Sequence, residues 1–185
     1  MIDNAVTRVI AQRRSVRKYV QRQLTQEELD TILTCGFMAP TGMNTQPWFV
    51  SVIQDPEVLA RMTEVTGNYM RSNPNLPPHL KKKYEDPNYS ASFGAPTLMI
   101  VSSSKPQGPT DASLLAENMV LAAQSIGLGT CILGSILVAF EGPENADLKA
   151  KLCLPEGCVP VFGIAVGEPA EQPEASPREA KYVII

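Results

Sequence analysis

The chain has 185 residues, of which 44% are hydrophobic and 19% are charged, and its formal net charge is −3. These values are typical of one globular domain with a sizeable core. The acidic balance disfavours nucleic-acid binding, which usually needs a basic face, but it leaves room for a local basic cluster that binds one phosphate. We expect no secretory signal, because no apolar run follows a positive start, and no membrane-spanning helix.

The cysteines and the only histidine narrow the chemistry further. Cys35, Cys131, Cys153 and Cys158 are scattered, and His79 stands alone. We therefore expect free thiols in a reducing cytoplasm rather than a metal site. One histidine also supports few catalytic triads, and the sequence has neither a G-x-S-x-G elbow nor a phosphate loop of the G-x-x-x-x-G-K-[ST] type. If the protein is an enzyme, a bound organic cofactor should carry the chemistry.

The first quarter of the chain predicts two helices. Apolar residues at helical spacing predict one near residues 4–12. Thr25 and Glu28 have the spacing of a capping box, so a second helix should begin there. It should end before Pro40, which disfavours helical geometry in the preceding residue.

The remainder of the chain predicts alternating strands and helices. Strands are expected at 48–53, 96–103 and 159–169, with a short apolar run at 131–136, and helices at 55–67, 111–129 and 142–152. Few strand–helix–strand units occur in this order, which indicates an α+β layered domain.

Two segments interrupt this pattern. Prolines, asparagines and tyrosines make 68–92 a long irregular segment or lid, and we interpret its lysine run, 81–83, as a solvated face. The tail over 170–185 is polar, then basic, then apolar. We expect it to leave the body and dock elsewhere, with 182–185 as a candidate last strand.

A basic cluster lies where the first helix should end. Arg13, Arg14, Ser15, Arg17 and Lys18 combine forked guanidinium donors with a hydroxyl, as a phosphate site requires. Cations also favour helix C-termini for purely structural reasons. On these residues alone, the phosphate site and the helix end are equally good interpretations.

The glycine pattern at 127–131 invites comparison with a dinucleotide-binding loop. It follows a helix instead of opening one after a strand, and Ile132 occupies the third glycine position. This disfavours a Rossmann site. A helix C-cap at Gly127 or Gly129 is the better interpretation.

The loop 39–48 carries polar and small residues beside the only tryptophan. Thr41, Gly42 and Asn44 offer hydrogen bonds and close backbone approach, and Trp48 would anchor the loop in the core. Taken alone, the loop is better explained as a structural turn.

Taken together, these runs resemble the nitroreductase family of FMN-dependent NAD(P)H oxidoreductases. The similar runs occur in family order over nearly the whole chain: RRSVRKY (13–19), LTQEEL (24–29), APTGMNTQPW (39–48), FGAPTLMIV (93–101), DASLLAENMVLAAQSIGLGTCILGSI (111–136), LPEGCVPVFGIAVGEP (154–169) and SPREAKYV (176–183). The resemblance implies an α+β fold, with an α-β-α sandwich around a mostly antiparallel central sheet. It also implies a single FMN-binding domain over 1–185 and an intertwined homodimer with FMN in its interface, onto which 170–185 docks.

The resemblance also implies roles for the basic cluster. Arg13 and Ser15 would bind the phosphate end of FMN, and Arg17 would lie near the pyrimidine edge of the flavin. Arg178 matches a late family arginine that reaches the phosphate, whereas Arg14 would contribute through its backbone. Phosphate binding thereby becomes the favoured interpretation of this cluster.

Two further groups are carried over from the family. One loop would come from the other subunit and pack on the flavin, through Pro40, Thr41, Gly42 and Asn44. A backbone amide in the run Leu133, Gly134 and Ser135 would face the flavin N5 atom. Asn68 is a candidate equivalent of a polar family residue.

The reaction implied is ping-pong transfer of hydride from NADH or NADPH, through the flavin, to a nitroaromatic, a quinone or a similar small acceptor. No catalytic side chain is required, and no nucleic acid or membrane partner is expected. Two alternatives stay open. One is a flavin-binding or sensory module without turnover. The other is a diverged reaction such as dehalogenation or dehydrogenation. The segment 68–92 would determine which reaction occurs, because it should cover the acceptor pocket.

Overall fold

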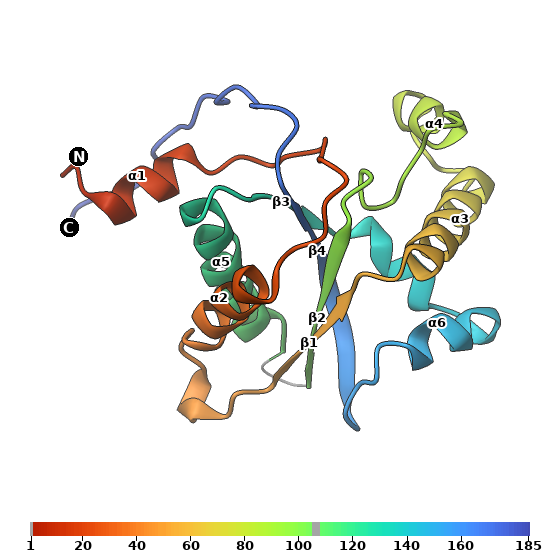
Figure 1. The fold of residues 1–185 in the computed structure, drawn as a ribbon, viewed down its shortest axis with the longest axis horizontal. Coiled ribbons are helices and arrows are strands. Elements are labelled where there is room, and N and C mark those ends of the chain that lie inside the picture. Colours follow the sequence, from red (N-terminus) through yellow and green to blue (C-terminus); the bar gives the residue numbers. More distant parts are fainter. Residues whose placement is uncertain (1, 105–107) are drawn as a thin grey trace.

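The computed structural model describes residues 2–104 and 108–185. Helices lie on both faces of a central sheet, with α1, α2 and α5 on one side and α3, α4 and α6 on the other (Figure 1). The elements are α1 (Ala5–Gln12), α2 (Gln26–Phe37), η1 (Gly42–Asn44), β1 (Trp48–Ile53), α3 (Pro56–Ser72), α4 (Pro78–Glu85), β2 (Thr97–Ser104), α5 (Gly108–Ser125), β3 (Gly129–Leu133), η2 (Ser135–Phe140), η3 (Pro143–Asn145), α6 (Ala146–Ala150) and β4 (Cys158–Gly167). The α+β sandwich expected from the sequence is confirmed.

The four strands form one sheet in the order β1-β2-β4-β3, and every neighbouring pair is antiparallel. The only parallel contact in the described chain is an isolated bridge between Ser15 and Thr130. The expectation of a mostly antiparallel sheet is therefore correct.

The core has two halves, one on each face of the sheet. Alternate residues of a strand point to opposite faces. Accordingly, Leu98 and Ile100 of β2 join the cluster beneath α3, and Met99 and Val101 join the cluster beneath α2 and α5. All four are fully buried. A strand covered on both faces needs a continuous apolar run, which explains the sequence of β2.

Several helix ends lie where local sequence signals placed them. In α2 the Thr25 hydroxyl accepts from the Glu28 backbone N–H at 3.2 Å, and the Glu28 carboxylate accepts from the Thr25 N–H at 2.7 Å. At the end of α5, Gly127 has a φ of 83°. The Leu128 N–H then bonds the Ala123 carbonyl at 2.9 Å, which is the Schellman cap.

The expectation that 68–92 is one long irregular segment is correct only for 73–77 and 86–92. Helix α3 continues to Ser72, past Gly67, and α4 follows within the same segment. Gly67 is buried inside the helix, where a Cβ atom would meet Arg71 at 3.0 Å and Tyr89 at 3.3 Å. Tertiary packing thus retains a residue that weakens an isolated helix. Pro78 opens α4, as proline does at a first helical position.

The helix expected over 142–152 and the strand expected over 182–185 have different outcomes. The helix expected over 142–152 is present as η3 followed directly by α6. The tail carries no strand at 182–185 in the described chain, and its last four side chains are at least 77% exposed. Its docking on a second subunit stays a prediction.

A close contact between β3 and the preceding basic segment gives a stability prediction. A Cβ atom on Gly129 would lie 2.8–2.9 Å from the Val16 side chain, so Gly129→Ala should lower the free energy of unfolding by about 1–3 kcal/mol. Gly134 is the matched control, because its φ of −81° suits any residue and a methyl group added there would meet no atom within 4 Å. Urea denaturation of both variants measures this, and equal stabilities would contradict the packing described.

Candidate functional site

The basic segment 13–20 leaves α1 and lies along the outer edge of β3. The Val16 N–H donates to the Thr130 carbonyl at 2.9 Å. Tyr19 is buried, and its hydroxyl donates to the Val16 carbonyl at 2.6 Å. Burial raises the pKa of Tyr19 and keeps it neutral. The backbone between the cluster's cationic side chains is therefore fixed to the sheet.

The beginning of the tail fixes the same segment from the other side. Val20 donates its N–H to the Glu168 carbonyl, and Ala170 donates to the Lys18 carbonyl, both at 2.9 Å. The Glu171 carboxylate accepts from the Arg17 backbone N–H at 2.6 Å. These bonds set the direction in which the tail leaves β4, and in Figure 1 the tail returns toward α1.

The returning tail closes a small cavity beside α1. The cavity has a volume of about 390 Å³ and is lined by Ile10, Ala11, Arg13, Arg14, Glu117, Ser176 and Arg178. Three arginines from opposite ends of the sequence thus meet at one place. The ion pairs of the described residues include none of these three guanidinium groups.

The two sequence-based interpretations of the cluster apply to different arginines. The Arg14 guanidinium donates to the carbonyls of Ala11 and Arg13 at 2.7 and 2.8 Å, so Arg14 closes the C-terminal end of α1. Within the described chain, the side chains of Arg13 and Arg178 take part in no such hydrogen bond. Their donors are available to an anion such as a phosphate.

Two further cations lie beside one aromatic ring, that of Phe93. The Arg17 guanidinium carbon lies 5.7 Å from the centroid of the Phe93 ring, and the Lys83 Nζ atom lies 4.9 Å from the same centroid. Sequence reasoning placed Lys83 on a solvated face and missed this contact. No local pattern signals it, because α4 brings Lys83 to Phe93 only in the folded chain.

The middle of β3 lies near cations of both groups. Burial raises the pKa of the Cys131 thiol, and the charges of Arg17, Lys83 and Arg13 partly offset that rise. Two residues further on, β3 ends at the buried Leu133. The exposed Gly134 follows, and a Cβ atom there would meet nothing within 4 Å. Open space next to this backbone suits a flat ring.

The loop expected on the flavin lies at the other end of the sheet. Through the strand pairing, Trp48 is level with Val159 on β4, whereas Ser15 is level with Val166 through Thr130. Seven strand positions span roughly 23 Å. One chain therefore does not bring the arginines together with Pro40, Thr41, Gly42 and Asn44.

The same loop is strained and faces outward. Met43, Asn44 and Gln46 all have positive φ angles, of 52°, 55° and 46°. The Thr41 hydroxyl accepts from the Gln46 N–H at 3.1 Å, and the Asn44 side chain accepts from the Gln46 amide at 3.0 Å. Backbone strain of this kind concentrates at functional sites. Trp48 is partly buried and packs against the core, as expected.

Comparison with known proteins decides the family. Residues 10–168 match the Nitroreductase family.

The chain belongs to the nitroreductase family.

Individual relatives agree with this assignment. A NADPH-dependent oxidoreductase of Staphylococcus epidermidis is 30% identical over 182 residues, which cover 94% of this chain and 68% of the relative. An FMN reductase (NADPH) of Bacillus subtilis is 29% identical, covering 98% of this chain and 72% of the relative. A crystal structure of a nitroreductase with bound FMN from Bacteroides fragilis has a TM-score of 0.86 at 28% identity, covering 99% of this chain and 100% of that chain.

In this nitroreductase-family chain, Asn68 lies apart from the arginines' cavity. It lines a different cavity of about 620 Å³, which α3 shares with η2 and the residues after it. Its side-chain oxygen accepts from Arg71 at 2.7 Å, and Arg71 also donates to the Tyr84 carbonyl at 2.6 Å. Asn68 therefore helps to hold α4 against α3, and its contact with a flavin stays a prediction.

None of the described helices combines the length and the apolar character needed to span a membrane. The part of the chain that the structure describes contains no group of three or more metal-binding side chains.

An ion-pair network that joins Arg22 to α2 and to the residue after β4 predicts a pH dependence. Arg22 bonds Glu28 at 2.9 Å and Glu168 at 2.8 Å. The hydrogen bonds from Arg22 lower the pKa of Glu28 from 4.5 to about 2. A lowered folded-state pKa stabilises the fold above the ordinary value, and this stabilisation is lost as the pH falls toward the folded value.

We expect Glu28→Gln to remove part of this acid sensitivity. Between about pH 5 and about pH 3, the urea midpoint should fall less for the variant than for the wild type. Glu174→Gln, on the exposed tail, is the control and should follow the wild type. Identical pH profiles for Glu28→Gln and the wild type would show that the network contributes nothing.

Proposed function

We propose that this protein, an FMN-dependent NAD(P)H oxidoreductase of the nitroreductase family, reduces nitroaromatics, quinones or similar small acceptors by a ping-pong mechanism. The observation that carries the proposal is the pair of available arginines, Arg13 and Arg178, that line one cavity. The open space beside the backbone at Gly134 supports it. The names of the relatives support the cofactor and the donor.

The residues present fit FMN at both of its ends. The guanidinium groups of Arg13 and Arg178, with the hydroxyl of Ser15 nearby in the chain, supply the donors that a phosphate dianion requires. The open backbone at Gly134 leaves room for the planar ring. Bound FMN supplies the ring that accepts and returns hydride.

The protein's own part is to bind and orient. Its only histidine is His79, and the basic cluster contributes permanent cations, so protons come from solvent. If one face of the bound ring were to serve both donor and acceptor, the oxidised donor would have to leave before the acceptor binds. The segment 68–92 is proposed to cover this face, because its helix α4 places Lys83 beside Arg17 across Phe93.

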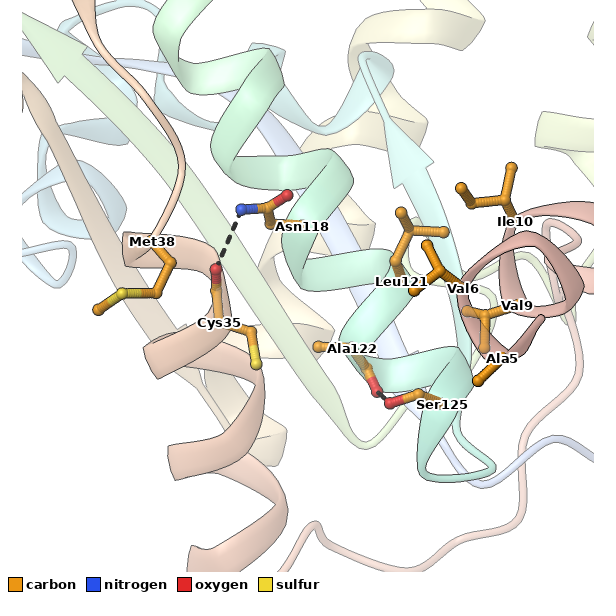
Figure 2. A pocket seen from close by; sticks show the side chains of 10 residues that line it. All are labelled: Ala5, Val6, Val9, Ile10, Cys35, Met38, Asn118, Leu121, Ala122 and Ser125. Atoms are coloured by element: carbon orange, nitrogen blue, oxygen red, sulfur yellow. Dashed lines mark hydrogen bonds between the residues drawn. The ribbon is translucent and has the colours of Figure 1, made fainter.

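A second copy of the chain would complete the site. An apolar groove of about 390 Å³ lies between α1, α2 and α5 (Figure 2). Its exposed side chains include Val6 at 66%, Ile10 at 54% and Met38 at 73%. Such a patch marks an interaction surface. We propose a homodimer in which this face is covered and the loop 40–44 of each chain reaches the flavin of the other.

The cysteines bear on the compartment of the protein. All four cysteines are free thiols, which supports the cytoplasm as the compartment.

Anaerobic addition of NADPH should bleach the yellow, FMN-loaded protein, and a nitroaromatic should restore the colour. A yellow protein that neither NADPH nor NADH bleaches would favour a binding module. Reoxidation by neither nitroaromatics nor quinones, but by an acceptor of another chemical class, would favour a diverged reaction.

The phosphate site gives a direct binding prediction. Arg13→Ala should weaken FMN binding at least tenfold, because a hydrogen bond to a charged group contributes about 1.5–3 kcal/mol. Fluorescence titration measures the dissociation constant. Riboflavin, which lacks the phosphate, should bind the wild type and Arg13→Ala equally. Lys18→Ala is the matched control and should bind FMN as the wild type does. Unchanged FMN affinity in Arg13→Ala would show that the basic cluster only terminates α1 and binds no phosphate.

The homodimer gives a second prediction. Val6→Asp places a charge in the apolar groove, so the variant should sediment as a monomer and bind FMN more weakly than the wild type. Tyr69→Asp, on α3 beyond the other face of the sheet, is the control and should stay dimeric. A wild-type protein that is monomeric while saturated with FMN would rule out the shared site.

A further inference from the structure

The cavity between α3 and the turn after η2 is separate from the arginines' cavity. Its volume is about 620 Å³, which lies within the range of small-molecule sites, about 300–1,000 Å³. Helix α3 forms one wall, and the residues from the end of η2 to η3 form the other. In Figure 1, α3 and α6 lie on the side of the sheet away from α1, α2 and α5. The cavity is therefore also remote from the apolar groove.

Asn145 brings a buried acceptor to this cavity. The residue is 5% exposed and lines the cavity. Its Nδ2 atom donates to the Glu141 carbonyl at 2.7 Å, and only the nitrogen side of the amide can make that bond. Among the described residues, no donor bonds the Oδ1 atom on the other side of the amide. Because a buried acceptor without a donor costs free energy, a donor on a ligand would stabilise it.

Two carboxylates lie on the same wall as this amide. Glu141 and Glu144 line the cavity, and neither forms an ion pair within the described chain. Gly142 has a φ of 76°, and a Cβ atom there would collide with the Glu144 carboxylate. The carboxylate thus lies against the backbone of the turn, at a place that only glycine leaves open. This end of the cavity presents acceptors with negative charge.

The remainder of the cavity offers apolar surface. Val65 of α3 packs against the core, and the half-buried Val138 of η2 lines the cavity from the other wall. Tyr69 adds a ring that is 49% exposed. Arg61 brings a cation to the lining, but its guanidinium already donates to Glu64 at 2.9 Å. A ligand here would meet apolar side chains along its body and acceptors at one end.

We propose that this cavity binds a small organic ammonium ion with an apolar body, of the alkylamine or arylalkylamine class. The N–H groups of the ammonium would donate to the Asn145 Oδ1 atom and to the carboxylates of Glu141 and Glu144. Hydrogen bonds between ionised partners are the strong ones, and an anion or an alcohol cannot supply them here. The inference does not rest on the FMN binding proposed above.

The test is calorimetric titration of the protein with phenethylamine and, separately, with phenethyl alcohol, which has the same apolar body without the charge. The wild type should bind the amine at least tenfold more tightly than the alcohol, because its bonds are charge-assisted. Glu144→Gln should lose at least tenfold in affinity for the amine and keep its affinity for the alcohol. Glu156→Gln, at an exposed carboxylate before β4, is the matched control and should follow the wild type.

A second variant tests the place of binding. Val138→Trp fills the cavity from η2, so it should abolish binding of both probes while the thermal unfolding transition stays cooperative. A wild type that binds no amine, or that binds amine and alcohol equally, would overturn the inference. Equal loss of amine affinity in Glu144→Gln and Glu156→Gln would overturn it too, because the effect would then be one of net charge alone. Bleaching of bound FMN by NADPH is a separate readout that none of these results changes.

Discussion

Like charges gathered beside β3 are the constraint on which the rest of this structure depends. Arg13, Arg17, Lys83 and Arg178 repel one another, and no ion pair in the described chain neutralises them. The backbone supplies the opposing force. Segment 13–20 is bonded to β3 on one side and to the beginning of the tail on the other. A rigid frame that holds cations at fixed places binds an anion without reorganisation, which is the condition for tight phosphate binding.

One chain alone does not assemble the whole proposed FMN site. The tail contributes Arg178 to the cavity, while the strained loop around Asn44 lies at the far end of the sheet. The apolar groove of α1, α2 and α5 lies on the face of the sheet that also carries the loop's preceding helix (Figures 1 and 2). Pairing two copies through this groove would account for the exposed apolar side chains and for the outward loop together.

How far the sequence predicted the structure depended on how local each signal was. The capping box of Thr25 and Glu28 and the cap at Gly127 involve residues three to five apart, and both are confirmed. Helix α3 continues past Gly67, where Arg71 and Tyr89 leave little room for a side chain. No local signal in the sequence shows this close packing.

The site followed the same rule. The basic cluster was visible because its members are consecutive in the sequence, and the family resemblance added the distant Arg178, which the structure brings to Arg13. Lys83 could not be found in this way. Its partner Phe93 lies ten residues along, across a turn, and the charged run containing Lys83 has the composition of a solvated helix. The distinction between Arg14 as a helix cap and Arg13 as an available donor likewise needed coordinates.

A crystal structure of the full-length protein with FMN is the measurement that tests the proposed site most directly. We expect the phosphate between Arg13 and Arg178, the pyrimidine edge at Arg17, and the loop 40–44 of a second chain against the ring. FMN bound elsewhere, or bound within one chain with the arginines still facing solvent, would contradict this site.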